Sequence, residues 1–256
     1  LSNITCEAQR EAVALADRVR AAIEAAVNQY EGALPADGWP NWVLGNHDNS
    51  RIATRVGKEQ ARNAAILLLT LRGTPTMYYG DEIGMQDVAI SADQVQDPQE
   101  KNIPGKGLGR DPERTPMQWD TSENAGFTSG KPWLPLMDDH KKINVEEEEK
   151  NEDSMLHFYK NLIQLRNDEP ALHIGKYIPV LAEGNMLSYL REHENKKFLI
   201  ALNLGDSEEK CGPKLKTWSG KVRIATHKEL YEKDVQNQVY LGPNQGVVVE
   251  IVSKEN

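Results

Sequence analysis

A histidine and a carboxylate stand side by side in the segment Asn46-His47-Asp48. This segment directly follows the short apolar run Trp42 to Leu44, which predicts a strand. In parallel α/β folds ligands bind at the carboxyl ends of the strands, so His47 and Asp48 are candidates for a binding or catalytic site. A structural alternative stays open, because Asp48 or one of the next two residues could instead cap a short helix over residues 51 to 55.

Two arginines, Arg110 and Arg114, stand four residues apart in a segment rich in proline and aromatic residues. An arginine in an ordered loop can bind a carboxylate through two hydrogen bonds and keep it ionised. The residues alone favour a local alternative, in which the two arginines pair with the neighbouring Asp111, Glu113 and Asp120.

A third candidate is Glu82, which follows the predicted strand Thr74 to Gly80. We expect Glu82 to form local hydrogen bonds where the strand turns into a loop, and we do not assign it acid/base chemistry. The chain has no GxSxG, GxxxxGK[ST] or HExxH motif, and no GxGxxG after a strand.

Composition excludes several partners. The 256 residues carry 39 acidic and 30 basic side chains, a net charge of −9, which argues against nucleic acid or an anionic membrane as the main partner. Cys6 and Cys211 lie far apart in the sequence, so we expect no metal site, no disulfide and no cofactor. The longest apolar run is too short to span a membrane and the first residues do not resemble a signal peptide, so we expect a cytoplasmic protein, with secretion not excluded.

Two strand-and-helix units position the candidate residues. Apolar residues every four positions predict a helix from Thr5 to Tyr30, and a second helix is predicted from Gly57 to Leu71. This second helix lies between the two predicted strands, which is typical of a parallel βαβ unit. A complete (β/α)8 barrel has about 250 residues but needs eight such units, so the chain length does not indicate a complete barrel.

The spacing of apolar residues changes twice after the second predicted strand. Periodicity is absent near residues 85 to 153, and Ser154 then caps a third predicted helix. Five short apolar runs bounded by turn residues follow Gly175, which indicates a small antiparallel β-sandwich. We therefore predict two domains, an α/β part over residues 1–172 and a sandwich over residues 173–256.

The chain resembles the α-glucosidase branch of glycoside hydrolase family 13, the α-amylase family. Residues Asn41 to Asp48 are similar to the signature region on the seventh barrel strand, and Gly73 to Gly84 resemble the eighth strand and its loop. The segment from Gly109 to Asp120 is similar to one typical of maltases and oligo-1,6-glucosidases. The resemblance implies the last part of a TIM barrel, from the sixth to the eighth helix with a long loop insertion, followed by the sandwich.

The resemblance also implies roles for three residues. Family members are retaining glycosidases that use a nucleophilic carboxylate and an acid/base carboxylate. By the match, Asp48 is a third carboxylate that stabilises the transition state, His47 is its neighbour on the sugar hydroxyls, and Arg110 lines the same glucose subsite. The implied partner is an oligosaccharide or disaccharide, and no metal or other cofactor is implied.

The nucleophile and the acid/base of the family belong to strands upstream of the residues present here, so we assign those roles to no residue. The implied function is therefore part of an α-glucosidase that needs an N-terminal part of the same barrel, and the 256-residue chain alone is predicted to be inactive. Two alternatives stay open: a non-catalytic glucosidase-like partner domain, and a trehalose- or sucrose-converting transglycosylase.

Overall fold

The computed structural model describes residues 19–180, 184–214 and 217–252. These residues form two compact units. The first comprises the described residues of Leu1–Trp42, Ala65–Pro75 and Leu162–Asn256, and the second comprises Val43–Ala64 and Thr76–Asn161. The candidate site residues Asp48, His47 and Arg110 all belong to the second unit.

The predicted helices are present where the structure describes them. Residues 19–33 are helical, whereas the predicted cap Thr5 lies outside the described residues. Helix α3 (Lys58–Thr70) confirms the second predicted helix, and the five-residue helix α2 (Ile52–Val56) precedes it. Helix α6 (Met155–Asp168) is the third predicted helix, and the Ser154 Oγ accepts a hydrogen bond from the His157 N–H at 3.2 Å, as expected of its cap.

Strands β1 (Asn41–Val43) and β2 (Thr74–Thr76) pair with each other in a two-stranded sheet. Strand β1 has the length predicted but begins one residue earlier, whereas β2 is shorter than the predicted Thr74 to Gly80. The apolar run that predicts β1 is not fully buried, because Val43 is 44% exposed. A pair of three-residue strands has too little surface to bury its own apolar residues.

Residues 84 to 154 are mostly turns and loops, as the absence of periodicity predicted. They contain only two short helices among the described elements, α4 (Pro98–Asn102) and α5 (Val145–Glu149), while the single-turn helix η1 (Asp81–Ile83) precedes them. A small buried cluster holds this unit together: Ile83, Met85, Met117, Met137 and Leu156. Methionine side chains can fill the irregular gaps that such loops leave.

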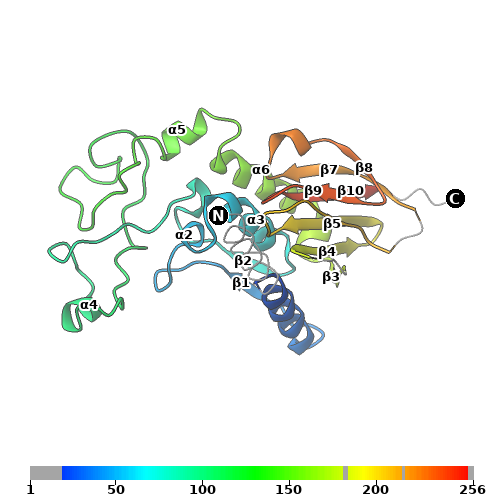
Figure 1. Cartoon of the computed structure of the whole chain (residues 1–256), viewed down its shortest axis with the longest axis horizontal. Helices are drawn as coiled ribbons and strands as arrows, with labels where there is room; N and C mark the ends of the chain where they lie inside the picture. Colours follow the sequence, from blue (N-terminus) through cyan, green and yellow to red (C-terminus); the bar gives the residue numbers. More distant parts are fainter. Residues whose placement is uncertain (1–18, 181–183, 215–216, 253–256) are drawn as a thin grey trace, which may run out of the picture. The chain divides into compact units, whose positions relative to one another are not determined.

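Helix α7 (Pro170–His173) leads into a six-stranded antiparallel sheet with the strand order β3-β4-β5-β10-β7-β8 (Figure 1). A second sheet pairs β6 with β9. The strands are β3 (Lys176–Pro179), β4 (Met186–His193), β5 (Lys196–Asn203), β6 (Glu209–Cys211), β7 (Ser219–Ala225), β8 (Asp234–Gln236), β9 (Val239–Leu241) and β10 (Gly246–Val252).

The five predicted strands correspond to β3, β4, β5, β7 and β10, whereas β6, β8 and β9 were not predicted. Each of these three has only three residues, which is too few for an alternating pattern to be recognised. Cys211 of β6 and Leu241 of β9 nevertheless belong to the same buried cluster as Leu199 and Val249 of the six-stranded sheet.

Two buried arginines hold the segments of the first unit together. The Arg166 Nη1 donates to the carbonyls of Leu69, Leu71 and Leu172 at 2.7, 2.9 and 2.7 Å. Arg191, on β4, donates to the carbonyls of Thr70, Leu172 and Gly175. Because the last carbonyls of a helix have no partner within the helix, the guanidinium groups supply the missing donors at the ends of α3 and α7.

We predict that Arg191→Met lowers the free energy of unfolding by about 2–3 kcal/mol, because the buried carbonyls of Thr70 and Gly175 lose this donor. Urea denaturation of the chain measures the difference. Lys197→Met is the matched control, since Lys197 forms only a partly exposed ion pair with Glu192 and should cost less than about 0.5 kcal/mol. Equal losses in the two variants would contradict the role of Arg191.

Candidate functional site

The segment Asn46-His47-Asp48 forms a tight turn that presents two side chains to solvent. The Asn46 Oδ1 accepts hydrogen bonds from the Asp48 N–H at 2.9 Å and from the Asn49 Nδ2 at 2.8 Å. The His47 Nε2 lies 3.4 Å from the Asp48 Oδ2, and their side chains are 67% and 47% exposed. The half-exposed Asp48 carboxylate is therefore accessible to a ligand.

The helix-cap alternative for this segment is wrong. Helix α2 begins at Ile52, and its N-cap position is Arg51, which forms no side-chain cap. Ser50 and the Arg51 N–H instead hydrogen-bond the Asp87 carboxylate. Since its side chain is not used in a cap, Asp48 is free to bind other groups.

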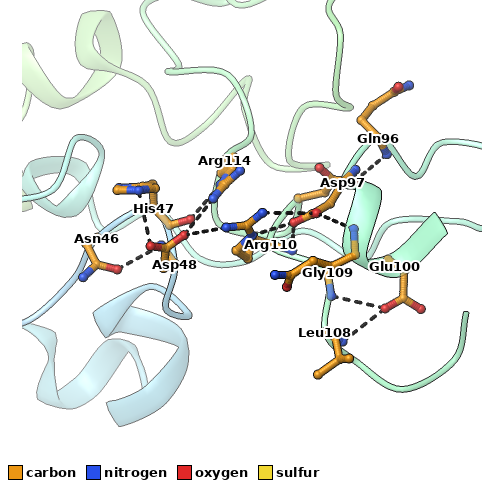
Figure 2. A network of polar contacts seen from close by, with 12 residues as sticks. Asn46, His47, Asp48, Gln96, Asp97, Glu100, Leu108, Gly109, Arg110 and Arg114 are labelled. Carbon is orange, nitrogen blue, oxygen red and sulfur yellow. Dashed lines mark hydrogen bonds and ion pairs between the residues drawn. The ribbon is translucent and has the colours of Figure 1, made fainter. Parts of the chain in front are cut away.

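Both candidate arginines bind Asp48. The Asp48 Oδ1 accepts a hydrogen bond from the Arg110 Nη1 at 3.1 Å and one from the Arg114 Nη2 at 2.9 Å. The Arg114 Nε also donates to the His47 carbonyl at 2.6 Å. Two elements far apart in the sequence therefore meet at one carboxylate (Figure 2).

The local pairing that the residues alone favoured is wrong for Asp111 and Asp120, whereas the charge of Arg114 still acts on Glu113. Asp111 accepts instead from the backbone N–H groups of Gln96 and Asp97, at 2.6 and 2.9 Å. Asp120 binds Ser122 within its own turn. Each of these carboxylates fixes the backbone of a loop, which leaves the guanidinium groups available for Asp48.

Asp97 is the residue that our sequence analysis missed. Its fully buried carboxylate accepts from the Arg110 Nε at 2.7 Å and from the Arg110 N–H at 3.0 Å. It also caps α4 by accepting from the Gln99 N–H at 2.9 Å. The sequence Asp97-Pro98 is a recognisable helix start, but nothing in it indicates the ion pair with Arg110.

The loop that delivers Arg110 is organised by Glu100. Its carboxylate accepts hydrogen bonds from the N–H groups of Leu108 and Gly109 at 3.1 and 3.2 Å (Figure 2). It also accepts one from the Gly105 N–H at 2.7 Å. A glutamate in α4 therefore fixes the backbone just before Arg110. With Asp97 as its N-cap, α4 sets both the position and the orientation of this guanidinium.

The arginines determine the charge of Asp48. Its limited desolvation opposes ionisation, but the hydrogen bond from Arg110, the charges of His47 and Arg110, and the hydrogen bond from Arg114 together lower the pKa of Asp48 below its ordinary value. The hydrogen bond from Arg110 likewise holds the pKa of Asp97 well below its usual range. Both carboxylates are therefore ionised at neutral pH.

A buried cationic side chain positions the strand end beside the site. Arg51 is fully buried, donates to the Tyr79 carbonyl at 2.5 Å and lies 5.0 and 4.7 Å from the ring centroids of Tyr78 and Tyr79.

The turn after Tyr79 requires a glycine. Gly80 has a φ of 88°, and a Cβ there would lie 2.6 Å from the Met85 Sδ, so only glycine fits. Glu82 accepts from the Gly80 N–H at 2.7 Å, which confirms its expected local hydrogen bond.

The described residues contain no group of three His, Cys, Asp or Glu side chains placed to hold a metal ion. Within the same residues, no helix is long and apolar enough to cross a membrane. The site therefore offers the exposed, ionised carboxylate of Asp48 with the imidazole of His47 next to it. The guanidinium groups of Arg110 and Arg114 hydrogen-bond this carboxylate.

Comparison with known proteins identifies the family. The pattern of the alpha amylase catalytic domain matches residues 2–175. The chain is 34% identical over 239 residues to the glucan 1,6-alpha-glucosidase of Streptococcus pneumoniae, covering 84% of this chain and 44% of that protein. Among solved structures, the isomaltulose synthase of Klebsiella sp. LX3 matches with a TM-score of 0.80 and 28% identity, over 90% of this chain and 46% of that one.

A third relative belongs to a different class of protein. The chain is 35% identical over 185 residues to an amino acid transporter heavy chain of Rattus norvegicus, covering 71% of this chain and 26% of that protein. The chain thus spans less than half the length of these relatives. Because the family pattern covers most of the chain and includes Asp48, His47 and Arg110, the chain belongs to the alpha-amylase family.

Proposed function

We propose that this chain is part of a retaining α-glucosidase that removes terminal α-linked glucose from maltose-, isomaltose- or sucrose-type oligosaccharides. The observation that carries the proposal is the Asp48 carboxylate, which is 47% exposed and held ionised by Arg110 and Arg114. The names of the relatives, a glucan 1,6-alpha-glucosidase and an isomaltulose synthase, support a glucoside as the substrate.

In this proposal Asp48 stabilises the transition state. Its free lone pairs accept hydrogen bonds from sugar hydroxyls, and these bonds strengthen as positive charge develops on the flattening ring. His47, whose Nε2 lies 3.4 Å from the carboxylate, binds a hydroxyl of the same glucose. Arg110 lines this subsite, and the two guanidinium groups hold the carboxylate in place before the reaction begins.

The nucleophile and the acid/base are assigned to no residue of this chain. A retaining pair stands about 5–5.5 Å apart, and we propose that an N-terminal part of the same barrel supplies it. We further propose that α3, α6 and the strands β1 and β2 are the last elements of that barrel. The 256-residue chain alone is then inactive, because it lacks both groups that make and break the glycosidic bond.

We also propose that the six-stranded sheet and the β6–β9 pair form the two layers of a small sandwich. The support is the buried cluster that joins residues of both sheets. The proposed domain boundary stays near residue 172, at the end of the helical part.

We also propose a cytoplasmic location for the protein. It agrees with the free, buried thiol of Cys211, the one cysteine within the described residues.

Two further functions have specific support. The likeness to an amino acid transporter heavy chain favours a glucosidase-like partner domain without catalysis. The likeness to isomaltulose synthase favours transfer of glucose to a sugar in place of water. The intact arrangement of Asp48 with its two arginines favours an enzyme over the partner domain, because it holds an ionised carboxylate in a fixed position where a sugar can reach it.

We predict that Asp48→Asn in the complete protein lowers kcat at least roughly 100-fold, because the neutral amide does not stabilise developing positive charge. Glucose released from p-nitrophenyl α-glucoside measures the rate, and thermal melting checks the fold. Asp206→Asn, at an exposed position outside the site, is the control and should retain activity. A wild-type protein that releases no glucose would exclude the proposed function, and near-full activity of Asp48→Asn would remove Asp48 from the mechanism.

A second prediction concerns pH. Arg114→Gln removes the guanidinium hydrogen bond, which is one of the interactions that lower the pKa of Asp48, so the carboxylate becomes protonated at higher pH and activity is lost earlier as pH falls. We expect the acid limb of the kcat/KM profile to move upward by up to about one pH unit. An unchanged acid limb at reduced activity would mean that Arg114 positions the segment without controlling its charge.

A further inference from the structure

Two tyrosine hydroxyls hold the backbone on both sides of Arg114. The Tyr78 hydroxyl donates a hydrogen bond to the Glu113 carbonyl at 3.2 Å. The Tyr79 hydroxyl donates one to the Thr115 carbonyl at 2.7 Å. The residue between these two carbonyls is the arginine whose guanidinium binds the candidate carboxylate, so two side chains from the end of β2 anchor the backbone that carries it.

Further hydrogen bonds fix the same short segment of the loop. The Arg114 N–H donates to the Asp111 carbonyl at 3.1 Å, and the Val88 N–H donates to the Pro112 carbonyl at 3.1 Å. Thr115, at the end of the segment, is fully buried. A shift of the Arg114 backbone would therefore break at least one of these bonds.

The rings of the two tyrosines are in turn held by Arg51. Its guanidinium lies over both rings, and the ring centroids of Tyr78 and Tyr79 lie 4.7 Å apart. The Nε and Nη2 of Arg51 are buried and have no hydrogen-bond acceptor among the described residues. Because a buried cation without acceptors costs free energy, the electron-rich ring faces compensate it, and the rings and the cation hold one another in place.

These contacts form a closed ring that returns to Asp48. Only two residues separate Asp48 from Arg51 along the chain. From Arg51 the contacts pass through the tyrosines to the segment of Arg114, whose Nη2 donates to the Asp48 Oδ1 at 2.9 Å. A reacting group held by such a supporting set of contacts keeps one orientation, which catalysis requires to within about 0.5 Å.

We propose that Tyr78 and Tyr79 are positioning residues, whose hydroxyls hold the guanidinium of Arg114 on Asp48. The inference rests on the proposed function, in which Asp48 stabilises the transition state. Each hydroxyl gives its proton to a backbone carbonyl, so the tyrosines act through Arg114 and not by donating to the sugar.

The test removes the two hydroxyls and keeps the two rings. In the complete protein, the double variant Tyr78→Phe/Tyr79→Phe should lower kcat for p-nitrophenyl α-glucoside roughly tenfold and change KM less than about twofold, because the transition state depends more on the position of the carboxylate than the bound substrate does. The acid limb of kcat/KM should move upward, as for Arg114→Gln. Tyr240→Phe is the matched control, since its exposed hydroxyl on β9 donates to the Gln238 side chain at 2.8 Å, and it should change none of these values.

A double-mutant cycle separates positioning from a general structural role. If the hydroxyls act through Arg114, removing them from the Arg114→Gln variant should lower kcat no further and should leave the acid limb in place. Equal losses with and without Arg114→Gln would overturn the inference, as would an unchanged kcat and acid limb in the double variant. If the double variant does not fold, the single variants Tyr78→Phe and Tyr79→Phe, which each remove one hydroxyl, give the same comparison.

Failure of the proposed function is recognised separately, by a wild-type protein that releases no glucose. The pKa of Asp48 is then measured by NMR of isotope-labelled aspartate carboxyl groups, with Asp48→Asn identifying the signal. The charged groups that face Asp48 are His47, Arg110 and Arg114. The NMR signal also distinguishes Asp48 from Asp81, because burial raises the pKa of Asp81 to about 6. A higher pKa of Asp48 in the double tyrosine variant supports the inference, and an unchanged pKa overturns it.

Discussion

The site depends on one buried ion pair. Asp97 has no solvent exposure, and its charge is acceptable there only because Arg110 and backbone N–H groups neutralise and hydrogen-bond it. This pairing uses the Nε side of the guanidinium and leaves Nη1 directed at Asp48. A loop with little regular structure can thereby hold a charged group in a fixed orientation. Without Asp97, the same arginine on a loop could adopt many rotamers.

In the first unit, two buried arginines satisfy backbone carbonyls and not a carboxylate. There Arg166 and Arg191 have no carboxylate partner within the described hydrogen bonds and instead donate to carbonyls at the ends of α3 and α7. Burial lowers the pKa of Arg191 to about 10, so the group is still charged at neutral pH. Several donors on one planar group can satisfy carbonyls from different segments at once. The two units thus use the same side chain, once to position a functional carboxylate and once to join segments of the fold.

The long elements with a clear period could be predicted, whereas β6, β8, β9, α4 and α5 could not. Helices α3 and α6 and the longer strands β4, β5 and β10 follow patterns over seven or more residues. Strands β6, β8 and β9 and the short helices α4 and α5 have no such pattern, because pairing with distant segments and caps such as Asp97 stabilise them more than their own sequence does. The long loop matters most for function, yet it has the weakest local signal.

The sequence by itself determined which residues stand at the carboxyl end of β1 and, through its motifs, which family the chain belongs to. It also identified Arg110 and Arg114 as a pair, because their spacing is local. Only the tertiary structure decided their partner, since 62 residues separate Arg110 from Asp48 and the nearer carboxylates offered a plausible alternative. Asp111 was excluded as a partner by backbone N–H groups that no side-chain pattern records. Ion pairs between residues on different loops depend on the path of the backbone in those loops, and only the three-dimensional structure shows that path.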